Sequence, residues 1–125
     1  MNWKTKLIWE LLSGIFLLAI IQCGSSTTAV TTAGVTTITI PTSAAGKTTA
    51  AFGTNPLHVP VGTKVVWTNS DSATHTSTSD TAVWDTGNIA SGATSTAVTF
   101  SASGTFPYHC ALHGKASMSG TIQVP

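Results

Sequence analysis

The chain has 125 residues, of which only 7% are charged, and its formal net charge is +1. This length accommodates one small domain, and beyond residue 22 three lysines balance three aspartates, so no basic surface is available for a nucleic-acid backbone. Thr and Val recur in short runs there, whereas strong helix formers are scarce, which favours strands and turns over helices.

Residues 1–22 are predicted to be an export signal. Two lysines precede an apolar run at residues 11–21, which is too short to span a membrane as a helix. Cys23 follows, and the segment resembles a bacterial lipoprotein signal, which is cleaved before a cysteine that then carries the lipid. Gln22 departs from the small residue that such signals usually place before the cysteine. An uncleaved membrane anchor and cleavage nearer Ala29 therefore stay open, and each of the three outcomes exports the remaining chain.

A segment of small, uncharged residues separates the signal from the rest of the chain. Residues 23–36 consist largely of Thr, Ser, Gly and Ala and hold too little apolar surface to form a core. We expect a flexible tether there, and an irregular first strand is the alternative. The folded domain is then predicted over residues 37–125.

Alternation of apolar and polar residues in short runs predicts strands that pack as an antiparallel β-sandwich. In chain order the runs lie at residues 36–40, around Phe52, and at residues 57–59, 64–69, 81–84, 94–100, 105–109 and 120–124. The run at 64–69 is the strongest, and the one at 81–84 is either a strand or an irregular excursion. No run after residue 22 has a helical period.

Three side chains of unlike chemistry lie close together near the C-terminus, in the pattern Cys-x2-His-x4-Met. Cys110, His113 and Met118 offer a thiolate, an imidazole and a thioether, a set that favours copper over zinc, magnesium or calcium. Cys110 and Met118 are also the only cysteine and methionine in the predicted domain. The set lacks a second imidazole, and His75, in the loop after the strongest predicted strand, is placed to supply it. The pattern therefore predicts a copper site.

Other interpretations of these residues are weaker. Cys110 alone would fit a small buried side chain, or a disulfide partner for Cys23. Zinc would accept one cysteine and two histidines with an open fourth position. However, Met118 is a poor zinc ligand, and no glutamate follows Glu10 to act as a base.

The two remaining histidines are expected outside the ligand set. His58 lies in a short strand between apolar residues and is interpreted as a surface or edge residue. His109 directly precedes Cys110, so the alternation of a strand turns it away from the face that carries the thiolate. It is expected at the surface or in a supporting position beside the site.

Two segments carry a family resemblance. Residues 60–69, followed by His75, and residues 104–113, followed by Met118, closely resemble the cupredoxins, and among them the plastocyanin, pseudoazurin and amicyanin group. The resemblance extends over about residues 38–124. It implies an all-β, antiparallel Greek-key sandwich that binds one type 1 (blue) copper ion. The implied ligands are the two imidazoles, the thiolate and the axial thioether: His75, Cys110, His113 and Met118.

The resemblance also implies residues that support the copper site. In the family, the backbone N–H of the residue after the first histidine donates a hydrogen bond to the thiolate, and here this residue is Thr76. Plastocyanins commonly carry Asn at this position and Ser or Thr after the cysteine, a pair that ties the two loops together. This chain has Thr76 and Ala111 and so lacks that pair. Asn69 is a third candidate for a supporting position.

The function implied is the transfer of single electrons by copper that cycles between Cu(I) and Cu(II), without catalysis. The family exposes the ligand that corresponds to His113, and Leu112, His113 and Gly114 would form the apolar rim where a partner docks. Expected partners are redox proteins of cytochrome, oxidase or reductase type. We expect a monomer, held by its N-terminal lipid or anchor on the extracytoplasmic side of a membrane, in the periplasm or at the cell surface. The alternative is a module for copper handling or delivery without redox turnover.

Overall fold

The computed structural model describes residues 34–125, and the predicted export signal and most of the predicted tether lie outside these residues. In the described part of the chain, no helix is long and apolar enough to cross a membrane. Its strands are β1 (Val35–Ile40), β2 (Leu57–His58), β3 (Thr63–Asn69), β4 (Thr78–Ser79), β5 (Val98–Phe100), β6 (Gly104–His109) and β7 (Ser119–Val124). β1 begins inside the segment that the sequence assigned to the tether.

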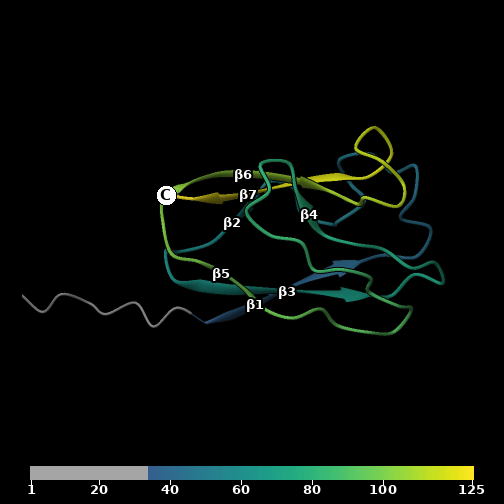
Figure 1. Cartoon of the computed structure of the whole chain (residues 1–125), viewed down its shortest axis with the longest axis horizontal. Helices are drawn as coiled ribbons and strands as arrows, with labels where there is room; N and C mark the ends of the chain where they lie inside the picture. The colour runs from purple at the N-terminus through teal and green to yellow at the C-terminus, as the bar shows by residue number, and fades with distance from the viewer. Residues whose placement is uncertain (1–33) are drawn as a thin grey trace, which may run out of the picture.

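Two sheets form the layers of a sandwich (Figure 1). One has the strand order β1-β3-β5 and the other β2-β7-β6-β4. The predicted all-β sandwich is confirmed, but its sheets are mixed, because β1 pairs with β3, and β2 with β7, in parallel. The chain passes through the second sheet as β2 between β1 and β3, which provides the long crossover that a parallel pair requires.

Alternate residues of the strands fill the space between the sheets. On β3, Val65, Trp67 and Asn69 are buried between more exposed neighbours, the period of a strand with one face on the core. The ring centroid of Trp67 lies 5.6 Å from that of Tyr108 on β6, and Tyr108 lies 4.7 Å from Phe52. Large, rigid side chains therefore join the two sheets.

Two of the predicted strands are loops that anchor in the core. Phe52 is buried within a series of turns. Trp84 is buried in an irregular segment, where its indole N–H donates a hydrogen bond to Ser77 Oγ at 3.1 Å. The run at 94–100 shortens to β5. The apolar residues at these positions correctly indicate burial. A strand also needs a neighbouring strand for its backbone hydrogen bonds, and these two segments have none over their predicted length.

The loops that follow β3 and β6 lie at one end of the sandwich, and the C-terminus lies at the other (Figure 1). The loop after β3 carries His75, and the loop after β6 carries Cys110, His113 and Met118. The fold therefore brings together residues that are more than thirty positions apart in the sequence.

Candidate metal centre

The loop that carries His75 is fixed by the backbone and by one amide side chain. His75 N–H donates to the carbonyl of Ile89 at 3.1 Å, and Ile89 N–H donates back to the carbonyl of His75 at 2.7 Å. Asn69 Nδ2 donates to the carbonyls of Ala73 and Ile89, at 2.7 and 2.9 Å. Asn69 therefore supports the site by bracing this loop, which holds the buried His75 ring in place.

The loop that carries the other candidate ligands closes on itself. Gly114 N–H donates to the carbonyl of Cys110 at 2.9 Å, and Met118 N–H donates to the carbonyl of Gly114 at 3.0 Å. Cys110 N–H donates to the carbonyl of Met118 at 3.2 Å, so the two ends of the loop are joined. Gly114 has a φ of 77°, a left-handed conformation that favours glycine. Cys110 and Met118 are both fully buried.

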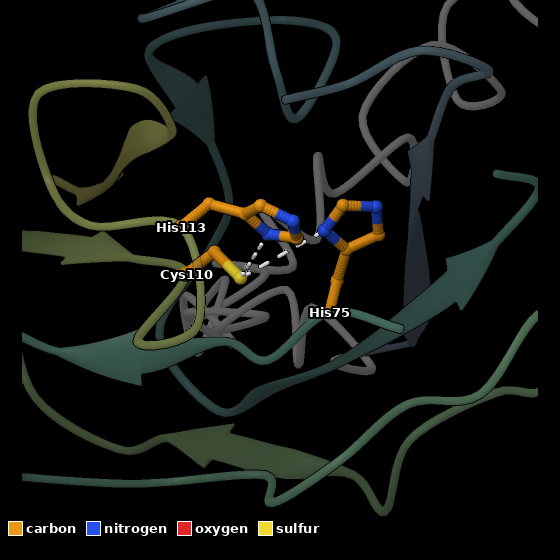
Figure 2. Close-up of side chains that lie close together, drawn as sticks. All are labelled: His75, Cys110 and His113. Atoms are coloured by element: carbon orange, nitrogen blue, oxygen red, sulfur yellow. Dashed lines mark hydrogen bonds between the residues drawn. The ribbon is translucent and has the colours of Figure 1, made fainter. Parts of the chain in front are cut away.

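The thiol and the two imidazoles converge at the end of the sandwich (Figure 2). Cys110 Sγ lies 3.3 Å from His113 Nδ1 and 3.7 Å from His75 Nδ1. One potential ligand atom from each residue lies within 4.8 Å of the others. Cys110 and His75 are fully buried, whereas His113 is partly exposed. Water thus has access to only one edge of the cluster.

Thr76 links the two loops at the sulfur atom. Its backbone N–H donates to Cys110 Sγ at 3.4 Å, which is the contact that the family resemblance implied. Its Oγ1 accepts a hydrogen bond from the backbone N–H of Ala111 at 2.8 Å. The loops are therefore tied by a side chain and a backbone group, although the chain lacks the pair of side chains found in plastocyanins.

Asp71 contacts His75 at Nε2, the ring nitrogen that does not face Cys110. The sequence pattern did not single out this residue. Its carboxylate accepts hydrogen bonds from the backbone N–H groups of Ser43, Ala44 and Ser72, at 3.0, 3.1 and 2.8 Å. The fourth contact joins Asp71 Oδ2 to His75 Nε2 at 2.9 Å. The bond with His75, together with the backbone donors, holds the pKa of the Asp71 carboxyl well below its usual value. Only the spacing of four residues before His75 could have suggested this role.

A second carboxylate holds the outer side of the ligand loop. Asp80 Oδ1 lies 2.6 Å from His109 Nδ1, and Lys115 forms an ion pair with the other oxygen. Burial disfavours the charged carboxyl, but the hydrogen bonds from Lys115 and His109 outweigh it, so the pKa of Asp80 is lowered. His109 is thus engaged away from the thiolate, and His58 is exposed on β2.

The donor set fits a single copper ion. One sulfur and two imidazole nitrogens are the three close donors of a trigonal blue-copper site, and such sites carry a weak axial fourth ligand. A backbone N–H directed at the sulfur is a further feature that tunes a metal-bound thiolate. Two of the three residues are fully buried and the donors are already close together, so little reorganisation is required to bind the metal.

The chain combines a two-layer β-sandwich with one cysteine and two histidines that lie close together at one end of it. This combination is typical of small proteins that bind a single copper ion. The family profile described as copper binding proteins, plastocyanin/azurin family, matches residues 39–125, and the chain belongs to this family. Copper is accordingly the metal of the site, with His75, Cys110 and His113 placed to bind one ion.

Solved structures of cupredoxins resemble the chain over most of its described length. A purple cupredoxin from Nitrosopumilus maritimus is 29% identical, with a TM-score of 0.62 over 71% of this chain and 98% of that one. Two amicyanin variants in the Cu(I) form are each 25% identical. Their TM-scores are 0.58, over 73% of this chain and 82% of the variant, and 0.59, over 74% and 83%. No curated protein sequence matches the chain.

Proposed function

We propose that this protein is a type 1 copper protein that carries single electrons between extracytoplasmic redox partners. His75, Cys110 and His113 would hold the copper ion, and Met118 would supply a weak fourth donor. The observation that carries the proposal is the close approach of Cys110 Sγ to both Nδ1 atoms, at 3.3 and 3.7 Å. Such a mixed site, with His75 and Cys110 fully buried, suits a metal that is retained during turnover.

Copper, when bound, supplies a one-electron couple between Cu(II) and Cu(I). The chain contributes a fixed arrangement of donors. Asn69 and Thr76 hold the loop of His75, and the turn at Gly114 holds the loop of Cys110. Loops held in this way keep one geometry in both oxidation states, so little rearrangement opposes electron transfer. The Thr76 N–H partly compensates the negative charge of the thiolate.

Electrons enter and leave through the exposed edge of His113. Leu112, beside it in the chain, is 54% exposed, and Gly114 follows, so the residues that flank His113 are uncharged and form the proposed apolar rim. Three lysines and three aspartates balance in the predicted domain, which favours docking through apolar contact rather than through charge. Partners of cytochrome, oxidase or reductase type would meet this rim.

The proposed setting is the outer side of a membrane, in the periplasm or at the cell surface. The basis is the sequence alone: an apolar run at residues 11–21 followed by Cys23, as a site for a lipid, with an uncleaved anchor as the alternative. The domain would then act as a tethered monomer, with the segment between Cys23 and β1 as the tether. Mass spectrometry of the membrane-extracted protein would detect a diacylglyceryl group on Cys23.

Visible spectroscopy and voltammetry of the copper-loaded protein test the proposed function. We expect an intense blue thiolate-to-copper band and a reversible one-electron wave, both lost in Cys110→Ser and His113→Ala. His58→Ala, which removes an exposed histidine remote from the cluster in the sequence, should retain both. A colourless protein that binds Cu(I) tightly and shows no reversible wave would instead favour copper handling or delivery.

A further inference from the structure

The contacts of Asp71 determine which atom of His75 carries a proton. Its Oδ1 accepts from the N–H groups of Ser43 and Ser72, and its Oδ2 accepts from Ala44 N–H. A backbone N–H can only donate, so both oxygens of Asp71 are acceptors, and three donors favour the carboxylate anion. The side chain is only 8% exposed, so water contributes little to its solvation.

The remaining partner of Asp71 is the imidazole of His75. A neutral imidazole has one protonated and one unprotonated nitrogen, and a carboxylate can only accept. The 2.9 Å contact from Asp71 Oδ2 therefore requires the proton of His75 on Nε2. The lone pair is then on Nδ1, the atom that lies 3.7 Å from Cys110 Sγ. The unprotonated nitrogen faces the metal position.

His75 differs in this respect from the other candidate imidazole ligand. In the described part of the chain, the side-chain hydrogen-bond contact found for His113 is the one from Nδ1 to Cys110 Sγ, at 3.3 Å. His75 is held at both of its nitrogens, buried on all sides, and attached to a carboxylate whose three other bonds reach residues 43–44 and 72. The orientation of the His75 ring is therefore held more firmly than that of His113.

We propose that Asp71 is a positioning residue of the copper site, which fixes His75 in the tautomer that offers Nδ1 to the metal and places a buried negative charge behind this ligand. The inference rests on the ligand role of His75 in the proposed function. Carboxylates that accept from a ligating histidine orient its ring and raise its basicity. A negative charge behind the ligand stabilises Cu(II) more than Cu(I), so Asp71 lowers the reduction potential.

Nitrogen NMR of the metal-free, full-length protein tests the tautomer without copper. We expect the His75 ring to carry its proton on Nε2 at neutral pH, with Nδ1 unprotonated. In Asp71→Asn, the amide must direct N–H groups at backbone donors or at His75, and we expect a mixture of tautomers. Asp85→Asn removes the same charge from an exposed carboxylate and should leave the His75 signals unchanged.

Copper affinity and potential provide the second readout. We expect Asp71→Asn to weaken Cu(II) binding by about 10- to 100-fold, the usual cost of losing a partner that orients a ligand. Each factor of ten lost for Cu(II) relative to Cu(I) raises a one-electron potential by about 59 mV. Asp85→Asn should change the affinity by less than twofold, well below the effect expected at Asp71.

Two results would overturn the proposal. One is a His75 proton on Nδ1 in the metal-free wild type, which requires no variant to fold. The other is a folded Asp71→Asn protein whose Cu(II) affinity and potential match those of Asp85→Asn. A wild type that shows the Nε2 tautomer but no blue band would count against the proposed electron carrier and leave the positioning of His75 by Asp71 intact.

Discussion

The backbone N–H of Ala111 donates a hydrogen bond to Oγ1 of Thr76 at 2.8 Å, and this bond joins the loop of Cys110 to the loop of His75. The N–H of the same Thr76 points at the Cys110 sulfur at 3.4 Å. One residue therefore sets both the distance between the loops and the polarity around the thiolate. The hydroxyl of Thr76 has a further neighbour in Thr78, at 3.0 Å between oxygens.

Replacing Thr76 by valine should destabilise the metal-free protein. Valine keeps the shape and the backbone N–H but removes the acceptor of the partly buried bond from Ala111 N–H, which costs about 1 kcal/mol. Thr76→Ser retains the oxygen and should lose less stability. Urea unfolding followed by tryptophan fluorescence gives both free energies. Equal stability of the valine and serine variants would show that the bond to Ala111 contributes little.

The candidate ligands could be predicted from the sequence because three of them share one short loop. Cys110, His113 and Met118 lie within nine residues, so their spacing reports their proximity without knowledge of the fold. Asp71 gave no comparable pattern. Its partners Ser43 and Ala44 lie 28 and 27 residues earlier, and only the packing of the loop after β1 against the loop after β3 brings them together.

The strand predictions succeeded where a neighbouring strand supports the alternation and failed where none does. The run at 64–69 became β3, the central strand of its sheet, with a partner on each side. Phe52 and Trp84 are also buried, but they fill the core from loops. The parallel pairing of β1 with β3 also depends on the order in which the chain visits the two sheets, which local patterns do not encode.

A methyl group at Gly120 should disrupt the aromatic core. A Cβ at this position would lie 2.5 Å from Cζ of the buried Tyr108 ring, closer than any normal contact. Overpacking of this kind costs typically about 1–3 kcal/mol. Gly34→Ala is the matched control, because no atom lies within 4 Å of its added methyl. Thermal and urea unfolding should separate the two variants, and equal midpoints would mean that Tyr108 moves aside freely.

The ion pairs of Asp80 predict a dependence of stability on acidity. The pKa of Asp80 is lowered in the folded protein from an ordinary value of 3.8, so its ionised form is favoured by folding. The contribution is present above pH 3.8 and is lost as the pH falls through the lower folded value. It should amount to about 1 kcal/mol or less, since the pair with Lys115 reaches the surface.

In the metal-free protein, the free energy of unfolding of Asp80→Asn should therefore fall less on acidification than that of the wild type. Asp85→Asn is the control, and its free energy of unfolding should fall as much as that of the wild type. Urea unfolding at a series of pH values from neutrality downward measures this difference. A wild-type curve that runs parallel to that of Asp80→Asn throughout would show that the contacts with His109 and Lys115 do not favour the ionised carboxyl.

Substitutions at Met118 should move the reduction potential in opposite directions. Met118→Leu removes the thioether that we propose as a weak donor to Cu(II), and it should raise the potential. Met118→Gln offers an oxygen, a harder donor that favours Cu(II), and should lower it. Leucine is close to methionine in volume, so its cost in stability should stay below about 1.5 kcal/mol. Identical potentials in all three proteins would remove Met118 from the ligand set.

Electron self-exchange between two copies of the copper-loaded protein tests the apolar rim without a native partner. Leu112 is 54% exposed beside His113, so Leu112→Asp removes apolar contact and places like charges opposite each other in the encounter. A loss of about 1–2 kcal/mol of encounter stability would slow exchange by about fivefold to thirtyfold. Val61→Asp is the control, because Val61 precedes β3 and so lies at the other end of that strand from the loop of His75.

The dependence of the same rate on salt separates apolar docking from charge steering. A rim with balanced charge should give a self-exchange rate that changes less than about twofold between 20 and 200 mM salt, although the Debye length falls severalfold over this range. Lys115 lies near the rim, but its ammonium is paired with Asp80, which limits its field. A tenfold change in the wild-type rate over this range, or equal rates for the Leu112 and Val61 variants, would show that docking occurs elsewhere or depends on charge.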